Sequence, residues 1–211
     1  MKKKNLLGAV IMLSAFIGWT LLIQYVDVQP IGPMGTIVGL AGVNSLIHNL
    51  TGVHMSLYTI TDWLGLVPIG IMFGFALLGL AQWIKRKNIR KVDYSILALG
   101  GFYLVVMAVY ILFETVVINY RPVLISGCLE ASYPSSTTVL VLCVMPTAVM
   151  QFNSRIKHKM LKKSIVAAVM AFAVFMVMGR LLSGVHWVSD IIGGILISAG
   201  LVQLYKSVSK T

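Results

Sequence analysis

The sequence contains few acidic residues and few cysteines, and both shortages restrict what the protein can be. Only 6 of its 211 residues are Asp or Glu, against 17 Lys and Arg, and charged residues make up 11% of the chain. Soluble domains carry about 25% charged residues, so this composition excludes an ordinary soluble fold. Cys128 falls in a loop-like stretch and Cys143 in an apolar one, which argues against a disulfide between them.

Sequence motifs for bound metals and nucleotides are also missing. The chain has no Cys or His cluster at metal-ligand spacing and no Gly-rich nucleotide loop. The sequence therefore predicts no metal site and no cofactor, and any catalysis has to come from the side chains themselves.

Apolar residues are abundant and make up 58% of the chain. A helix needs about 20 mostly apolar residues to cross the hydrocarbon core of a bilayer. Stretches of this kind occur at residues 5–27, 61–84, 94–118, 135–152, 164–182 and 187–205. We therefore predict an all-α integral membrane protein, in which residues 1–211 form a single six-span bundle.

The segment between the first two spans is too long for a simple turn and has a helical pattern of its own. Apolar residues recur at Leu40, Val43, Ile47 and Leu50, with polar residues such as Asn44 between them. This pattern predicts a helix lying in the outer membrane interface. Two roles are open for this helix: it covers the bundle, or it guides a lipid headgroup inward.

Basic residues are distributed unevenly along the chain, and this predicts the orientation of the protein. Fifteen of the 17 form four clusters: Lys2, Lys3 and Lys4; Lys85, Arg86, Lys87, Arg90 and Lys91; Arg155, Lys157, Lys159, Lys162 and Lys163; Lys206 and Lys210. Six spans bring all four clusters to one side, which the positive-inside rule makes cytoplasmic. We expect a plasma-membrane protein with both termini inside and residues 28–60, 119–134 and 183–186 outside. The clusters lack the interleaved aromatics of nucleic-acid sites, so no nucleic-acid partner is expected.

Arg121 and Arg180 are the two basic residues outside these clusters, and both fall near the outer ends of spans. Ionisable groups at such positions usually face protein or water and serve a function. Guanidinium groups match phosphate oxygens in geometry and stay charged, so both arginines are candidate phosphate ligands. The alternative is that they pair with Glu114, Glu130 or Asp190 as structural ion pairs.

His186 and Asp190 are four residues apart, so they share one face of a helix that begins near His186. Asp190 can then accept a hydrogen bond from one ring nitrogen and leave the other free to attack. A lone outer histidine is usually inert, but Arg180 lies six residues upstream and favours a reactive one. Such an imidazole can take up a phosphoryl group and form a phosphohistidine that water hydrolyses.

The pattern over residues 114–190 resembles the type 2 phosphatidic acid phosphatase (PAP2) superfamily of membrane lipid phosphatases and haloperoxidase relatives. The third motif of that family reads Ser-Arg, five residues, His, three residues, Asp. In this chain it reads Gly179-Arg180, five residues, His186, three residues, Asp190, so only the serine is replaced. The resemblance implies a six-helix fold, His186 as nucleophile, Asp190 as its orienting partner and Arg180 as a phosphate ligand.

The first two motifs of the family are present only in part. The first motif has Lys, six residues, then Arg-Pro, and here Glu114 replaces the lysine ahead of Arg121. The second motif is Pro-Ser-Gly-His, and the matching residues are Pro134, Ser135, Ser136 and Thr137. The family's general acid, the histidine, is therefore replaced by Thr137.

Ser135 and Ser136 open the fourth predicted span, where free backbone amides and the positive end of the helix dipole can hold phosphate oxygens. Ordinary N-capping of the helix is the alternative role, and it is compatible with phosphate binding. The predicted site thus has His186 and Asp190 as catalytic residues and the following substrate-binding residues: Glu114, Arg121, Ser135, Ser136, Thr137 and Arg180.

Both motif changes predict altered chemistry. Glu114 repels phosphate unless it is protonated or neutralised, and loss of the general acid typically lowers a rate by about 100- to 10,000-fold. A leaving group that is itself a phosphate needs little protonation, so a lipid diphosphate suffers less than a phosphomonoester. Alternatively, Glu114, His48 or His54 supplies the proton.

Two functions from different classes remain open. The first is a lipid phosphatase or phosphotransferase that acts on a polyprenyl diphosphate, a phosphatidate or a similar lipid at the extracytoplasmic face. The second is a catalytically inactive PAP2-like protein that binds an anionic lipid headgroup for transport, sensing or assembly. A channel or secondary transporter has less support, because the sequence shows no inverted repeat.

Overall fold

The computed structural model describes residues 2–209, and within them the structure is all-helical with no β-strand. The α-helices are α1 (Lys2–Tyr25), α2 (Ala41–Thr51), α3 (Met55–Leu64), α4 (Leu66–Arg86), α5 (Tyr94–Thr115), α6 (Ser136–Arg155), α7 (Lys159–Leu182) and α8 (Val188–Val208). Two 3-10 turns, η1 (Pro33–Gly35) and η2 (Ile89–Lys91), lie in the connections. The predicted all-α fold is confirmed.

Six helical segments of residues 2–209 are long and apolar enough to cross a membrane, as predicted. The second and fifth segments begin earlier than predicted, at Met55 and Lys159 in place of residues 61 and 164. In the second, α3 and α4 continue through Gly65 as one segment, Met55–Arg86. Pro68 lacks an N–H and its ring crowds the carbonyl of Leu64, which explains the break between the two helices. The protein is therefore a multi-pass membrane protein.

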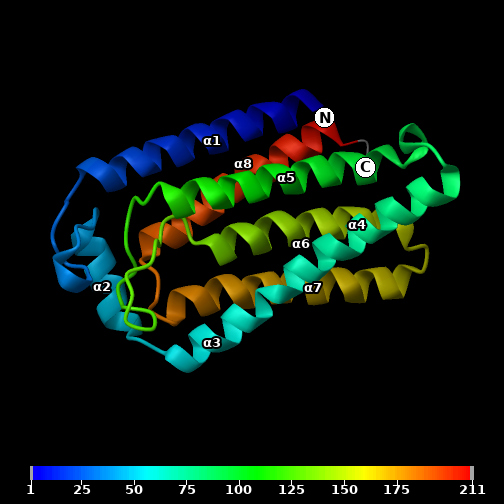
Figure 1. The fold of residues 1–211 in the computed structure, drawn as a ribbon. Helices are drawn as coiled ribbons and strands as arrows, with labels where there is room; N and C mark the ends of the chain where they lie inside the picture. Colours follow the sequence, from blue (N-terminus) through cyan, green and yellow to red (C-terminus); the bar gives the residue numbers. More distant parts are fainter. Residues whose placement is uncertain (1, 210–211) are drawn as a thin grey trace.

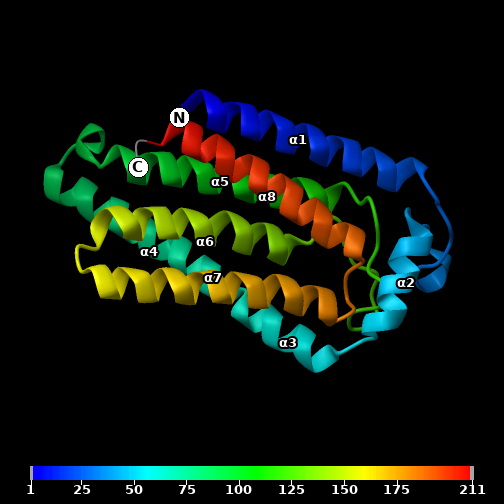
Figure 2. The same ribbon diagram turned by 180° about the vertical axis from the view of Figure 1, so that it is seen from behind.

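The two most buried spans, α6 and α8, form the centre of the bundle. Helix α8 packs along α1 and α6, and α7 packs along α6 (Figures 1 and 2). The core between them includes Val139, Val144 and Leu201. Apolar side chains on the outer helices are exposed instead, for example Phe73 at 64% and Leu104 at 73%, as expected for surfaces that contact lipid tails.

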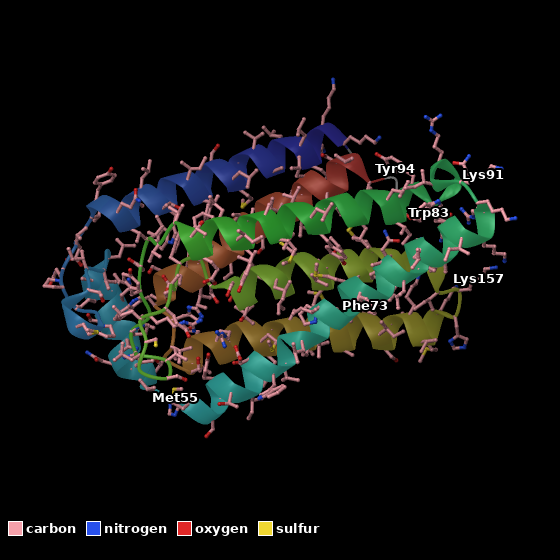
Figure 3. The ribbon with its side chains drawn as sticks, viewed as in Figure 1. Met55, Phe73, Trp83, Lys91, Tyr94 and Lys157 are labelled. Carbon is pink, nitrogen blue, oxygen red and sulfur yellow. The ribbon has the colours of Figure 1, made fainter. Side chains whose placement is uncertain are left out.

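The two ends of the bundle differ in charge. The start of α1, the end of α8 and the α4–α5 and α6–α7 connections lie at one end (Figure 1). Lys91 and Lys157 lie there and Met55 at the opposite end (Figure 3). The basic clusters thus share one end, as predicted, except that Lys210 lies outside the described residues. The end opposite them carries α2 and the connections that hold Arg121 and His186.

Helix α2 lies across this second end, between the first two spans (Figures 1 and 2). The polar Asn44 of this helix is buried, while Val43 and Leu50 are 57% and 74% exposed. Asn44 Nδ2 donates to Ser189 Oγ at 3.0 Å, and Asn44 Oδ1 accepts from the Ser189 backbone N–H at 3.1 Å. The helix therefore holds the first turn of α8, which leaves its apolar side chains facing outward.

We predict that Asn44→Ala lowers the free energy of unfolding by about 1–3 kcal/mol, because it leaves the first turn of α8 without a buried amide partner. The thermal unfolding midpoint in detergent measures this loss. Asn49→Ala, on an exposed position of the same helix, is the matched control and should behave as wild type. Equal midpoints for the two variants would contradict this role of Asn44.

Candidate active site

His186 lies in the short turn between α7 and α8, and this turn is held against the α2–α3 connection. The backbone N–H of His54 donates to the Ser183 carbonyl at 2.9 Å. Gly184 has a φ of +68°, and a Cβ at this position would collide with the Gly52 carbonyl. The positive φ and the close approach of the Gly52 carbonyl both require a glycine at position 184. Without a side chain there, the backbone of the turn can contact the backbone of the α2–α3 connection.

The Nε2 atom of His186 faces two guanidinium groups. Arg180 Nη2 lies 3.2 Å from it, and Arg121 Nη1 lies 3.4 Å from it. Arginine can only donate hydrogen bonds, so Nε2 must be the unprotonated, accepting nitrogen of a neutral ring. Burial, reinforced by Arg121 and Arg180, holds the pKa of His186 well below its usual value, which keeps the ring neutral.

The Nδ1 atom of His186 faces Ser132, a residue that the sequence analysis did not single out. Ser132 Oγ lies 3.0 Å from Nδ1 and donates a hydrogen bond to Asp190 Oδ2. The direct distance from Nδ1 to Asp190 Oδ2 is 3.8 Å, too long for the hydrogen bond expected from the His-Asp spacing. The i, i+4 geometry thus brings the two residues together, but a serine hydroxyl stands between them.

Asp190 is fully buried and has partners other than His186. Its Oδ2 accepts the Trp187 backbone N–H at 2.9 Å, and its Oδ1 accepts from Asn119 Nδ2 at 3.4 Å. Asn119 and Ser132 lie near the two ends of the α5–α6 connection, and Trp187 lies in the turn before α8. The carboxylate therefore ties this connection to the turn that holds His186.

The two arginines are buried but incompletely bonded. Arg121 is 8% exposed and Arg180 is 1% exposed. Arg121 Nε lies 3.0 Å from Glu130 Oε2 and Arg180 Nη1 lies 3.6 Å from Asp62 Oδ1, but neither contact has hydrogen-bond geometry. Among residues 2–209, Arg121 Nε and Arg180 Nε and Nη1 have no hydrogen-bond partner. Because buried donors are rarely left unbonded, these groups indicate an anionic ligand.

One face of both guanidinium groups contacts the ring of Tyr58 from α3. The ring centroid lies 4.9 Å from Arg180 Cζ and 5.8 Å from Arg121 Cζ. A ring placed against two cations of like charge offsets part of their mutual repulsion through its quadrupole. Tyr58 therefore helps to hold the two arginines side by side.

A cavity of about 960 Å³ opens next to these arginines. At its polar end it is lined by predicted site residues: Glu114, Arg121, Ser136, Thr137 and Arg180. Its flank is apolar and is formed by side chains of α4, α5 and α6, among them Ile69, Met107, Phe113 and Leu140. The cavity therefore matches a ligand with a charged head and an apolar tail.

Three predicted site residues lie outside the lining of this cavity. His186 and Asp190 are buried, and the arginines contact both His186 Nε2 and the cavity. Ser135 is fully buried, and its hydroxyl accepts from Thr138 Oγ1 at 3.0 Å. Ser135 occupies the N-cap position of α6 but makes no side-chain capping bond, so the expected side-chain capping is absent.

Two of the proton donors considered from the sequence also lie away from the cavity. The ring of His48 contacts Trp187 in a tilted arrangement with centroids 5.4 Å apart, and His54 Nε2 contacts the Thr51 carbonyl at 2.9 Å. Neither residue is part of the cavity lining, whereas Glu114 is.

Comparison with known proteins bears on the family and the fold of the chain. The family model of the PAP2 superfamily matches residues 114–211, which confirms the resemblance seen in the motifs. This part of the chain, with α6, α7 and α8, carries the PAP2 pattern. Comparison with curated proteins gave no match.

Among solved structures, the chain is similar to a transmembrane PAP2 type phosphatidylglycerolphosphate phosphatase from Bacillus subtilis. The sequences are 20% identical, the TM-score is 0.54, and the similarity covers 95% of this chain and 94% of the other. At this identity the likeness establishes the fold, which therefore extends over nearly the whole chain and includes the first two spans.

The ring of Tyr58 should be needed for anion binding. We expect Tyr58→Ala to weaken binding of inorganic phosphate by about 2- to 30-fold, which corresponds to about 0.5–2 kcal/mol of lost cation–π stabilisation. Tyr58→Phe keeps the ring and should bind as wild type. Isothermal titration of the purified protein in detergent measures both, and a Phe variant as weak as the Ala variant would assign the effect to the hydroxyl instead.

Proposed function

We propose that the protein is a membrane lipid phosphatase or phosphotransferase that acts on a lipid phosphate or diphosphate. The observation that carries the proposal is the accepting Nε2 of His186, which lies within 3.4 Å of two buried guanidinium groups beside a half-apolar cavity. A nucleophile, charge-offsetting donors and room for a lipid tail are thus adjacent. These are the elements that phosphoryl transfer from a lipid requires.

In the first step the lone pair of Nε2 attacks phosphorus, and the bond from phosphorus to the leaving oxygen breaks. The leaving oxygen takes that electron pair, while Arg121 and Arg180 donate to the phosphoryl oxygens. In the second step a water oxygen bonds to phosphorus, and the electron pair of the P–N bond returns to Nε2. One water proton stays on the phosphate and the other passes to solvent.

The substrate class follows from the groups that line the cavity. Thr137 replaces the family's acid and Glu114 replaces its lysine, so a poor leaving group would depart unprotonated and a dianion would meet a carboxylate. A diphosphate avoids the first problem, because its leaving group is a phosphate. We therefore favour a polyprenyl diphosphate or a similar lipid diphosphate over a phosphatidate.

The orientation proposed from the charge distribution accounts for access to such a lipid. Basic clusters at one end of the bundle favour a cytoplasmic position for that end, with both termini inside the cell. The site at the opposite end then faces the extracytoplasmic side of the cell membrane. Headgroups in the outer leaflet would reach the arginines while the tail stays along α4 and α5.

A second candidate function is binding of an anionic lipid headgroup without catalysis. The observation that favours it is the position of Arg121 and Arg180 on Nε2, which occupies the nitrogen that would have to attack. With Thr137 in place of an acid, a bound lipid would then be held without turnover. Such binding would serve transport, sensing or assembly.

Phosphate release separates the two functions. We expect the purified protein to release phosphate from polyprenyl diphosphate faster than from polyprenyl phosphate, phosphatidate or phosphatidylglycerophosphate. His186→Ala should lower this release by more than about 1,000-fold, because the covalent step is lost. His158→Ala, at the start of α7 and far from the site, is the matched control. Lipid binding without release from any of the four would favour the second function.

Restoring the family residues should broaden the substrate range. We predict that Glu114→Lys lowers KM for a lipid monophosphate by about 10-fold or more, because it replaces a repelling charge by a charged hydrogen-bond donor. Thr137→His should raise kcat for the same substrate by up to about 100-fold, since it adds a proton donor. Measured kcat and KM that stay at wild-type values in both variants would show that neither position contacts the substrate.

A further inference from the structure

We propose that Ser132 is a positioning residue that couples His186 to Asp190 and fixes which ring nitrogen attacks. The inference deepens the function proposed above and rests on it. It starts from one observation: Ser132 Oγ lies 3.0 Å from Nδ1 of His186 and donates to Asp190, whereas the ring and the carboxylate are 3.8 Å apart.

The backbone fixes Ser132 in this place. Its N–H donates to the Asn119 carbonyl at 2.9 Å, and the Arg121 N–H donates to the Glu130 carbonyl at 3.1 Å. The two antiparallel segments thus bring the Ser132 hydroxyl and the Arg121 guanidinium to opposite nitrogens of one ring. Ser132 lines the cavity but is only 2% exposed, so its hydroxyl is largely shielded from bulk water.

The hydrogen bonds that run from His186 through Ser132 to Asp190 allow one arrangement of protons. An ionised Asp190 can only accept, so the single Ser132 proton goes to Asp190 and the Ser132 oxygen accepts from Nδ1–H. The ring is then protonated on Nδ1 and bare on Nε2. The arginines on the other side of the ring favour the same tautomer, because they can donate to a bare Nε2 but cannot accept from an Nε2–H.

This tautomer is the one that the reaction needs. When Nε2 bonds to phosphorus, positive charge develops on the ring while the proton stays on Nδ1. The chain from Nδ1–H through Ser132 to the Asp190 carboxylate stabilises that charge without a proton leaving the ring. When water breaks the P–N bond, the ring returns with the same tautomer and is ready for the next turnover.

Asp190 cannot easily take over the role of Ser132. Its Oδ2 also accepts the Trp187 backbone N–H at 2.9 Å, and Trp187 is the residue that precedes α8. A movement of the carboxylate toward Nδ1 would weaken this contact at the start of the helix. A direct Asp–His bond therefore competes with the local structure of α8.

The test combines tautomer and kinetics. Nitrogen NMR of the full-length protein, labelled with ¹⁵N-histidine in detergent, reports which ring nitrogen of His186 is protonated, and a His186→Asn sample assigns the signal. We expect Nδ1–H alone in the wild type and in Ser132→Thr, and an added Nε2–H signal in Ser132→Ala, where only the arginines still favour Nδ1–H. With polyprenyl diphosphate, Ser132→Ala should lower kcat about 10- to 100-fold with little change in KM, as for other groups that orient a histidine.

Ser198→Ala is the matched control, since Ser198 is buried in α8 and bonds the Val139 carbonyl at 3.4 Å, away from the site. An Nε2–H signal in the wild type would overturn the proposal without any variant. Wild-type kcat and tautomer in Ser132→Ala would also overturn it, and if that variant does not fold, Ser132→Cys takes its place. No phosphate release from the wild type, together with the expected tautomers, would sink the proposed function but leave the coupling intact.

Discussion

The site depends on a neutral imidazole held between two buried cations and one buried carboxylate. Arg121 and Arg180 approach Nε2 of His186, and their burial is costly because several of their N–H groups have no hydrogen-bond partner among the described residues. The remaining contacts of the site reduce this cost. Tyr58 covers the guanidinium faces, Glu130 and Asp62 offset the charge from the cavity mouth, and Asp190 lies behind the ring. An anion at the cavity would satisfy the same donors better than any of these groups.

In the structure both arginines lie on Nε2 of His186, and a guanidinium group that donates there blocks the lone pair that would attack in the proposed reaction. Phosphate oxygens carry charge and make stronger, charge-assisted hydrogen bonds than a neutral imidazole, so a bound phosphate would draw the arginines off Nε2. In the proposed reaction, Nε2 would then become free when the group that it attacks is in place.

Sequence patterns predicted the parts of the structure that depend on one segment at a time. The lengths of the apolar stretches predicted the six spans. The sequence spacing also predicted that three residues meet, namely Arg180, His186 and Asp190, because all of them lie on or between two consecutive helices. Ser132, Tyr58 and Asp62 were missed because each reaches the site from a distant part of the chain, and no spacing records such contacts. The pattern of α2 predicted a helix but not its contact with α8, because the bond from the buried Asn44 amide to Ser189 joins residues far apart in the sequence.

The charges around the cavity connect its stability with its selectivity. Glu130 and Asp62 are 41% and 58% exposed, so solvent weakens their hold on the arginines, and neither contact has hydrogen-bond geometry. Glu114 lies on the cavity wall, and no ion pair among residues 2–209 includes it. Under the proposed function, a headgroup that binds here must gain more from the arginines than it loses to Glu114. We expect a diphosphate to do so more readily than a monophosphate, because its second phosphate would add acceptors for the unbonded donors of Arg121 and Arg180.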